Sequence, residues 1–338
     1  MNAIAAAGVE LTYSDGTRAV RGVDLEVPEG EFFGFLGPNG AGKTTAIKTL
    51  TTLLHPTAGS VTVNGFDVVE EPRSVRASIG YMAQETSIDE ELTARENVRF
   101  ACEAYGVPRS ERADRIDELL DLVDLADVAD KRSEGFSGGM QKRLDVAMAL
   151  VHRPPLVFLD EPTTGLDPKA RIDLWEYFRE INRQGTTVFL TTQYLEEADQ
   201  LCDRLSVIQD GEIVATDSPE TLKSRVGGDV LEITIEDASD EERERARRIA
   251  AESGLFEEGA IETTEDGISV TSKAARRSGT DLLVALRDAG FTVVGFDVRS
   301  PTLDDVFLAI TGEPADDDGE DGEAAGTGDD AAELEASR

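Results

Sequence analysis

Short stretches of alternating or continuous apolar residues mark the strands that this sequence predicts. A run such as Leu156-Val157-Phe158-Leu159 is typical of a strand buried on both faces, whereas alternation is typical of a strand with one polar face. Turn pairs such as Asn64-Gly65 and Asp210-Gly211 favour hairpins. The strands predicted before residue 226 cover residues 9–13, 23–27, 31–36, 61–63, 156–159, 187–191, 205–209 and 212–215.

Helical spacing of apolar residues dominates the chain from residue 89 to about 135 and recurs between the later strands. Pro108 interrupts this spacing, and Ser110 is a suitable residue to begin the next helix. We therefore interpret residues 89–135 as a helical insert within an α/β domain that spans residues 1–226. The helices predicted in this domain cover residues 46–54, 90–105, 110–122, 137–150, 171–183 and 194–202.

The glycine pair Gly227-Gly228 separates this domain from a smaller one, predicted over residues 227–312. The order of its elements is βαββαβ, which is typical of a ferredoxin-like α+β domain. A last amphipathic helix, 303–310, is expected to close this domain. Residues 313–338 are predicted to be a disordered acidic tail, because they cannot bury enough apolar surface to fold. The βαββαβ elements are strands at 230–235, 260–263, 268–271 and 291–298 and helices at 241–253 and 281–289.

The segment from Gly37 to Thr45, GPNGAGKTT, carries the clearest chemical signal in the chain. It matches the pattern G-x-x-x-x-G-K-[ST] and stands between an apolar strand and a helical pattern, where this motif binds phosphate. Its glycines let backbone N–H groups point at phosphate oxygens, and the helix start adds unpaired donors. Lys43 is expected to reach the β- and γ-phosphates, and the Thr44 hydroxyl to bind Mg²⁺. The predicted phosphate ligands are Gly37, Pro38, Asn39, Gly40, Ala41, Gly42, Lys43, Thr44 and Thr45.

Two carboxylates, Asp160 and Glu161, follow the apolar run at 156–159. At the carboxyl end of a strand, Asp160 is suited to hold Mg²⁺, and Glu161 is suited to accept a proton from attacking water. The segment Ser137-Gly138-Gly139 opens a predicted helix, which Ser137 can cap while the glycines let a phosphate approach. Acidic pairs are common in so acidic a chain, so these assignments depend on all the motifs occurring together.

Taken together, these motifs resemble the ATP-binding cassette (ABC) ATPases, in the family's order, over residues 1–225. The resemblance implies an α/β fold: a P-loop NTPase-type ATPase domain with a mixed sheet core, an antiparallel β subdomain and a helical insert, plus the small α+β C-terminal domain. Ser137-Gly138-Gly139 corresponds to the core of the family's signature motif, which completes the ATP site of the opposite subunit. The flanking Phe136 and Met140 differ from the usual LSGGQ spelling but leave this core intact.

The resemblance implies further roles. Tyr13 corresponds to the aromatic residue that stacks on adenine, with a core tyrosine as the alternative, and Gln84 corresponds to the glutamine that senses Mg²⁺ and attacking water. Gly165-Leu166-Asp167 corresponds to the loop that contacts the other subunit. The implied catalytic residues are Glu161, Lys43, Gln193 and Gln84; the nucleotide is also bound by Tyr13, Ser137, Gly138, Gly139 and Asp167; and Mg²⁺ is bound by Thr44, Gln84 and Asp160.

One position departs from the family pattern. Gln193 stands where the family has a histidine that donates a hydrogen bond to the γ-phosphate, and an amide can donate but cannot carry a proton. The drug-resistance exporter branch includes members with glutamine here, so we expect an active enzyme in which this residue works by positioning. The segment 301–312 also resembles the closing motif of that branch, although its apolar stripe is equally that of a plain packing helix.

Charge limits the partners of this chain. Aspartate and glutamate outnumber lysine and arginine 69 to 33, which gives a formal net charge of −36. Such a chain repels nucleic acids and anionic lipid headgroups. Its composition resembles that of proteins from halophiles, whose molar internal salt screens self-repulsion, with a generic acidic protein as the alternative.

The sequence therefore predicts an ATPase subunit that uses ATP and Mg²⁺, forms a homodimer on ATP binding and drives a separate ABC-2-type membrane permease of an exporter. No apolar run reaches the roughly 20 residues that cross a bilayer, so we expect a cytoplasmic protein held at the inner face of the membrane through its permease. The alternatives are a non-transport ABC ATPase and an ATP-binding regulatory module with little turnover.

Overall fold

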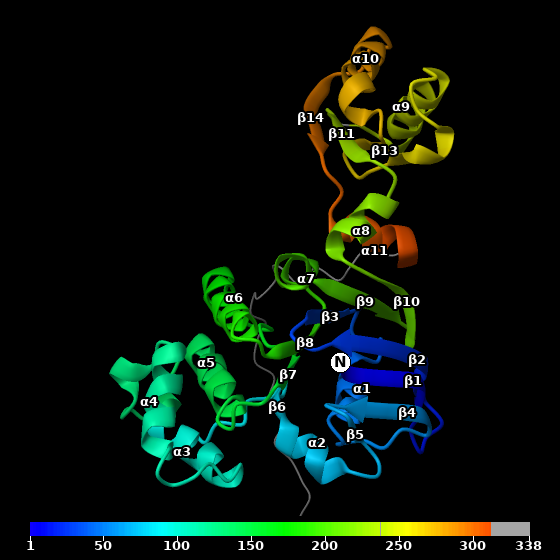
Figure 1. Cartoon of the computed structure of the whole chain (residues 1–338). Coiled ribbons are helices and arrows are strands. Elements are labelled where there is room, and N and C mark those ends of the chain that lie inside the picture. Colours follow the sequence, from blue (N-terminus) through cyan, green and yellow to red (C-terminus); the bar gives the residue numbers. More distant parts are fainter. Residues whose placement is uncertain (237, 312–338) are drawn as a thin grey trace, which may run out of the picture.

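The computed structural model describes residues 1–236 and 238–311, and the predicted acidic tail lies outside them. A six-stranded sheet with the order β10-β9-β3-β8-β7-β6 forms the centre of the larger domain (Figure 1). Its strands run parallel except for β10, which pairs antiparallel with β9. They are β3 (Phe32–Leu36), β6 (Ile79–Met82), β7 (Leu156–Asp160), β8 (Thr187–Thr192), β9 (Arg204–Gln209) and β10 (Glu212–Asp217).

Continuous apolar runs form the centre of this sheet. Every residue of β3, β7 and β8 is buried, because helices or a second sheet cover both faces. The phenylalanine rings on one face pack at centroid distances of 5.4–5.7 Å, and they belong to Phe33, Phe35, Phe158 and Phe189. The prediction of a buried strand from the run at 156–159 is confirmed.

The second sheet is antiparallel, with the order β2-β1-β4-β5. It shares a hydrophobic core with helix α1 and with the phenylalanine face of the central sheet. Its strands are longer than the apolar alternation predicted, because ladder pairing extends β1 and β2 through polar positions. They are β1 (Asn2–Thr12), β2 (Arg18–Pro28), β4 (Ala58–Val63) and β5 (Phe66–Asp67).

Helices cover the other face of the central sheet and extend beyond it. The helix predicted at 46–54 begins at Lys43, directly after the glycine loop. The helix predicted from residue 90 begins at Ala94, because Thr93 and Glu96 form a capping box there. The sequence analysis missed β6, α2 and α8. The helices of this domain are α1 (Lys43–Leu50), α2 (Pro72–Ser78), α3 (Ala94–Ala104), α4 (Arg112–Leu122), α5 (Gly138–Ala149), α6 (Pro168–Arg183), α7 (Leu195–Leu201) and α8 (Pro219–Arg225).

The smaller domain contains a four-stranded antiparallel sheet with the order β12-β13-β11-β14, and helices α9 and α10 cover one face of it. This is the strand order of a βαββαβ ferredoxin-like fold. Helix α10 begins at Ala275, before the predicted residue 281. The elements are β11 (Asp229–Ile235), α9 (Asp240–Glu252), β12 (Ile261–Thr263), β13 (Gly267–Ser272), α10 (Ala275–Asp288) and β14 (Val293–Arg299).

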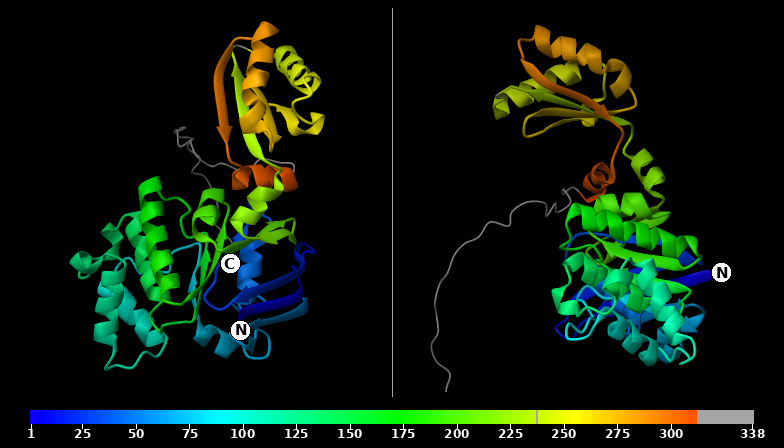
Figure 2. Two further views of the ribbon diagram at one scale, coloured as in Figure 1. Left: turned by 45° about the horizontal axis from the view of Figure 1, so that its top comes forward. Right: turned by 90° about the vertical axis from the view of Figure 1, so that its left-hand side faces the viewer.

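The last helix, α11 (Leu303–Thr311), does not close the smaller domain as expected. It packs instead against α7 and α8, and Leu303, Val306 and Phe307 are buried in the core of the larger domain (Figure 2). The amphipathic stripe showed that the helix would pack, but not on which partner. The chain thus leaves the larger domain after α8 and returns to it at α11.

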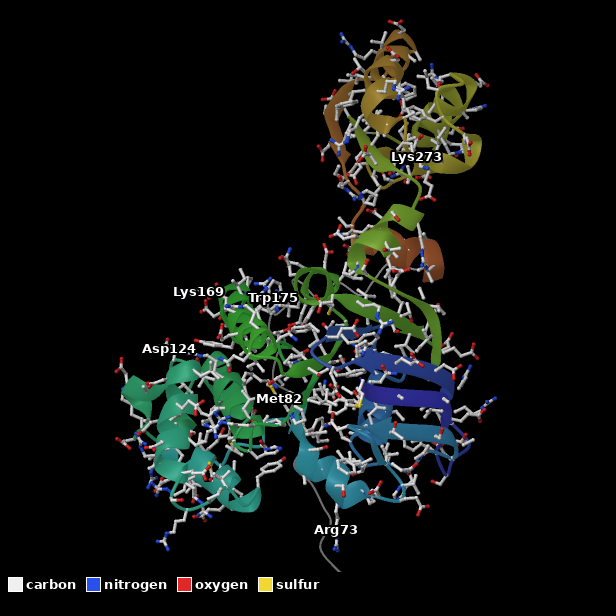
Figure 3. The ribbon with its side chains drawn as sticks, in the orientation of Figure 1. Arg73, Met82, Asp124, Lys169, Trp175 and Lys273 are labelled. Carbon is white, nitrogen blue, oxygen red and sulfur yellow. The ribbon has the colours of Figure 1, made fainter. Side chains whose placement is uncertain are left out.

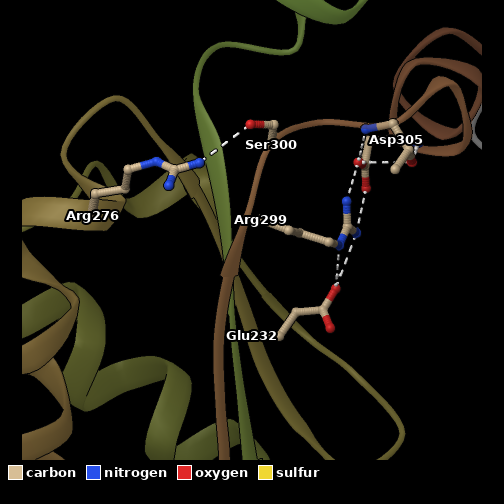
Figure 4. Close-up of polar contacts among 6 residues, drawn as sticks. Glu232, Arg276, Arg299, Ser300 and Asp305 are labelled. Carbon is tan, nitrogen blue, oxygen red and sulfur yellow. Dashed lines mark hydrogen bonds and ion pairs between the residues drawn. The ribbon is translucent and has the colours of Figure 1, made fainter.

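An arginine holds the corner between β14 and α11 (Figure 4). Arg299 donates two hydrogen bonds to the Asp305 carboxylate, at 2.6 and 2.9 Å, and a third to Glu232 at 3.1 Å. The Asp305 carboxylate also accepts from the Thr302 backbone N–H at 2.7 Å. A bidentate arginine–carboxylate pair fixes direction as well as distance, so it orients α11 relative to the sheet.

None of the helices described in residues 1–236 and 238–311 is both long and apolar enough to span a membrane.

Candidate active site

The glycine loop lies between the end of β3 and the start of α1, and two of its glycines cannot be replaced without displacing backbone. A Cβ on Gly42, whose φ is 106°, would lie 2.4 Å from the Ala19 carbonyl oxygen, and one on Gly37 would lie 2.4 Å from that of Ile208. No side chain caps the N-terminus of α1. The first N–H groups of this helix are therefore available to an anion such as a phosphate.

Lys43 is buried at the start of α1, where its ammonium contacts the loop and a carboxylate. Its Nζ donates to the backbone oxygens of Gly37 (2.8 Å) and Pro38 (3.1 Å) and lies 3.1 Å from Glu161 Oε1. Both side chains of this ion pair are almost completely buried, at 3% and 7% exposure. A triphosphate entering the loop would offer Lys43 other anionic partners and so compete with Glu161.

Glu161 joins three distant segments of the chain. It has a left-handed backbone, with φ of 47°, and its N–H donates to the Thr191 carbonyl oxygen at 3.1 Å. While Oε1 pairs with Lys43, Oε2 accepts a hydrogen bond from Gln84 Nε2 at 3.0 Å. The structure therefore brings together Lys43, Gln84 and Glu161, which the sequence analysis had placed in one site from three separate motifs.

Asp160 ends β7 with one carboxylate oxygen unpartnered. Its Oδ1 accepts from Thr191 Oγ1 at 2.6 Å, whereas Oδ2 is buried and has no hydrogen-bond partner among the described residues. Burial raises the pKa of Asp160, and a bound cation would favour its charged form. A buried, unpartnered carboxylate oxygen fits a hard cation such as Mg²⁺. No cluster of three or more His, Cys, Asp and Glu side chains suited to a metal occurs in residues 1–236 and 238–311. A Mg²⁺ ion beside Asp160 would be held together with the Thr44 hydroxyl, Gln84 and phosphate oxygens.

Tyr13 follows the end of β1 and lies beside the glycine loop. Its hydroxyl is 3.0 Å from Thr45 Oγ1, and 40% of the residue is exposed. The alternative of a core tyrosine is therefore wrong, and the ring is accessible to a planar ligand next to the phosphate loop.

Ser137 and Asp167, which were predicted to contact the other subunit, each cap a helix at the surface. Ser137 accepts a hydrogen bond from the Met140 N–H at 3.3 Å at the start of α5, and Asp167 accepts one from the Ala170 N–H at 2.9 Å at the start of α6. Ser137 and Gly138 are exposed. No hydrogen bond or ion pair among the described residues joins Ser137 to the glycine loop of its own chain.

Gln193 lies between β8 and α7, and its side-chain oxygen is buried without a hydrogen-bond partner among the described residues. The next residue, Tyr194, lies under the guanidinium of Arg171, whose carbon is 4.9 Å from the ring centroid.

The sequence analysis missed a buried carboxylate beside this site. Glu197 Oε1 accepts hydrogen bonds from Thr163 Oγ1 at 3.0 Å and from Trp175 Nε1 at 2.9 Å. Trp175 lies where α6 meets α7 (Figure 3). An acidic residue on the buried stripe of a short helix is the signal that could have identified Glu197.

Helix α5 also holds the segment that carries Gln84, which the sequence did not indicate. Lys142 Nζ donates to the Gln84 carbonyl oxygen at 2.7 Å. One turn later, Asp145 accepts hydrogen bonds from the Ser87 N–H (3.2 Å) and hydroxyl (2.8 Å). The helix that begins at Ser137 is therefore bonded at two points to the loop that places Gln84 against Glu161.

Comparisons with known proteins agree with this geometry. Residues 20–164 match the family model described as ABC transporter, and residues 218–311 match that of the ATP-binding protein DrrA1-3-like, C-terminal domain. The daunorubicin/doxorubicin resistance ATP-binding protein DrrA of Streptomyces peucetius is 43% identical over 316 residues, which cover 93% of this chain and 94% of the relative. The Nod factor export ATP-binding protein I of Burkholderia thailandensis is 38% identical over 310 residues, which cover 91% of this chain and 97% of the relative.

A solved structure extends the comparison to three dimensions. It is an ATP-binding cassette described as the dimeric structure of a post-hydrolysis state bound to ADP and Pi, with a TM-score of 0.59 and 29% identity over 64% of this chain and 98% of that one. The predicted fold class, the resemblance to the ABC ATPases and the predicted ATPase activity are thereby confirmed. The chain belongs to the ABC transporter ATP-binding proteins of the DrrA type, the ATP-hydrolysing subunits of drug-resistance and export-type transporters.

Proposed function

We propose that two copies of this chain close around ATP and thereby drive a separate ABC-2-type membrane permease of an exporter. The carrying observation is the Ser137-Gly138-Gly139 segment, whose Ser137 and Gly138 are exposed and whose Ser137 has no hydrogen bond to the glycine loop of its own chain among the described residues. Its helix N-terminus suits a phosphate, and a head-to-tail pair would place it against the nucleotide of the other copy. Relatives named for drug resistance and Nod factor export, and a related cassette described as dimeric, support this arrangement.

Within each site, the residues have distinct roles. Lys43 and the N–H groups of the glycine loop hold the β- and γ-phosphates, and Tyr13 stacks on the adenine. Once Lys43 has turned to the phosphates, Glu161 Oε1 is released to accept the proton of the attacking water, which Gln84 orients. Gln193 donates an amide hydrogen bond to the γ-phosphate. Mg²⁺, held by Thr44, Gln84 and Asp160, would neutralise charge on the phosphate oxygens.

ATP binding joins the two copies and hydrolysis separates them, so the chemical cycle becomes a mechanical one. The helical insert with α3 and α4 transmits this motion to the permease. Asp167, which caps α6 at the surface, contacts the other copy. The chain works in the cytoplasm at the inner face of the membrane, and its net charge of −36 disfavours nucleic-acid partners.

A Ser137→Arg change in a Glu161→Gln background tests the shared site. Glu161→Gln slows hydrolysis and is expected to keep an ATP-bound dimer that size-exclusion chromatography detects. Adding Ser137→Arg should abolish this dimer, because the larger, charged side chain would occupy the place of the phosphate that the other copy binds. ATP binding to the monomer should stay within about twofold, because Ser137 acts on the other copy.

If Ser137→Arg weakens ATP binding to the monomer, the segment works within its own chain and the proposal fails. Lys43→Ala in the same background is the matched control, and it should abolish ATP binding itself. Co-purification of the full chain with the membrane protein encoded beside it tests the permease partnership, and the permease should no longer be stimulated by ATP when it is paired with Lys43→Ala.

A further inference from the structure

Glu197 is a buried carboxylate to which the mechanism proposed above assigns no role. It lies in the first turn of α7 and is 1% exposed. Oε1 accepts hydrogen bonds from Thr163 Oγ1 (3.0 Å) and Trp175 Nε1 (2.9 Å), while Oε2 is buried without a hydrogen-bond partner among the described residues. Burial raises the pKa of this side chain, and its side-chain hydrogen bonds, followed by the nearby Arg171, partly oppose the rise.

Packing alone explains this residue poorly. A carboxyl group removed from water is costly, and the cost is greatest for an oxygen without a donor. Replacing buried polar groups by well-packed apolar side chains is often neutral or stabilising. The protein nevertheless holds a glutamate here, so the reason must lie in what its hydrogen bonds connect.

The two donors belong to a loop and a helix that the proposed mechanism uses. Thr163 follows closely after Glu161 in the loop that ends at Asp167. Trp175 is on α6, the helix that Asp167 caps. Glu197 itself lies in the first turn of α7, the helix that begins just after Gln193. Oε1 of Glu197 therefore links three segments. They are the loop that carries Glu161, helix α6, and helix α7, which follows Gln193.

We propose that Glu197 is a positioning residue that holds Gln193 in register with the Glu161–Asp167 loop. When nucleotide moves that loop, the bonds from Thr163 and Trp175 carry the movement to α7 and thus to Gln193. This inference rests on the roles proposed above for Glu161, Asp167 and Gln193. Glu197 touches neither nucleotide nor water and acts only through its neighbours.

The first test removes one hydrogen bond without changing volume. Thr163→Val in the full-length chain should lower kcat for ATP about tenfold, because it deletes a buried hydrogen bond to an ionisable group, and should leave KM within about twofold. Thr163→Ser, which restores the hydroxyl, should recover kcat to within about twofold of the original protein. Thr187→Val is the matched control. Thr187 is also 1% exposed, but among the described residues its hydroxyl accepts a hydrogen bond only from the Gly30 N–H, at 2.8 Å.

The second test follows the link directly. Trp175 is the only tryptophan of the chain, so intrinsic fluorescence reports on the indole that donates to Glu197. MgATP should shift the emission of the original protein and of Thr187→Val, and Thr163→Val should lose at least half of that shift at saturating nucleotide. A purely structural role would leave the shift intact.

The outcomes separate this inference from the proposed function. If Thr163→Val keeps its kcat, or loses it only as Thr187→Val does, or keeps the full emission shift, Glu197 has no positioning role. Gln193→Ala is assayed in parallel for the proposed role of Gln193. If that variant turns over like the original protein, the γ-phosphate role of Gln193 is wrong, and the kcat and emission of Thr163→Val still decide whether Glu197 positions the Glu161 loop.

Discussion

Glu161 has a different partner on each carboxylate oxygen. The ammonium of Lys43 lies 3.1 Å from Oε1, and the amide of Gln84 donates to Oε2 at 3.0 Å. Removing either partner of a buried ion pair destabilises the fold, because the other charge is left buried and unpaired. Lys43 and Glu161 therefore neutralise each other in this structure, and a phosphate that bound the lysine would have to compete with this pair.

Glu161→Gln should consequently have two separable effects. Hydrolysis should fall by about 100-fold or more, because the general base is lost. The affinity for ADP, which is not hydrolysed, should rise about three- to tenfold, because Lys43 no longer has an anionic partner to leave. Calorimetric titration with MgADP measures the second effect.

Glu31→Gln is the control for this prediction, because Glu31 pairs with Arg204 at 3.0 Å and with no residue of the glycine loop. It should leave the MgADP affinity unchanged. Equal ADP affinities in Glu161→Gln and the original protein would show that the Lys43–Glu161 contact does not oppose binding.

For single residues, the sequence allowed a role to be predicted where a short motif around the residue sets its place in the fold. Lys43 and Asp160 could be predicted as site residues because a glycine loop or a strand end places them within a few residues of the motif. The contacts of Glu197 with Thr163 and Trp175 could not be predicted, because they join residues that are distant in sequence and meet only when α6 and α7 pack together.

Helix α5 links two parts of the site at the scale of a single element. Its N-terminus carries Ser137, which is proposed to contact the nucleotide of the other copy. Lys142 and Asp145, on the same helix, hold the segment from Gln84 to Ser87. Because a helix is stiff over this length, displacement of Ser137 would displace Gln84, and therefore its contact with Glu161.

Lys142→Met tests this coupling while keeping most of the side-chain stem. We expect kcat to fall about three- to tenfold, because the bond to the Gln84 carbonyl oxygen is lost, and the ATP-dependent dimer to persist in the Glu161→Gln background. Steady-state ATPase assays and size-exclusion chromatography measure the two quantities. Lys131→Met, at an exposed position of the helical insert, should behave like the original protein. The same turnover in both variants would remove α5 from any role in placing Gln84.

Elements were predicted well where periodicity was strong and poorly at their ends. The helix start at Ala94 was missed, although Thr93-x-x-Glu96 has the spacing of a capping box, because apolar spacing was followed past it. The short helix α2 and strand β6 were missed because neither is long enough to show a period. Strand β6 is defined by its pairing with β7, which is a tertiary contact.

At the scale of the whole molecule, α11 shows that sequence order and packing need not agree. The strand order β12-β13-β11-β14 was implied by the βαββαβ pattern. The partner of α11 was not, because an apolar stripe specifies burial but not the surface that buries it. The Arg299–Asp305 pair turns the chain after β14 so that the stripe meets α7 and α8.

If α11 belongs to the core of the larger domain, its buried residues should stabilise that domain. Phe307→Ala should lower the free energy of unfolding of the ATPase domain by about 2–4 kcal/mol, as expected for a phenylalanine of which 4% is exposed. Leu308→Ala, the neighbouring position with 45% exposure, should change it by no more than about 0.5 kcal/mol. Urea unfolding followed by Trp175 fluorescence isolates the relevant transition, because Trp175 and Phe307 share one hydrophobic core.

The same titration decides between the two possible partners of the helix. Far-ultraviolet circular dichroism reports on both domains, whereas Trp175 reports on the larger one. If Phe307→Ala shifts only a transition that Trp175 does not detect, α11 stabilises the ferredoxin-like domain and its docking on α7 and α8 contributes little. If Phe307→Ala shifts the transition that Trp175 detects, the ferredoxin-like domain is inserted between two segments of one hydrophobic core. A structural change at the proposed nucleotide site could then reach the ferredoxin-like domain through α7 and α11.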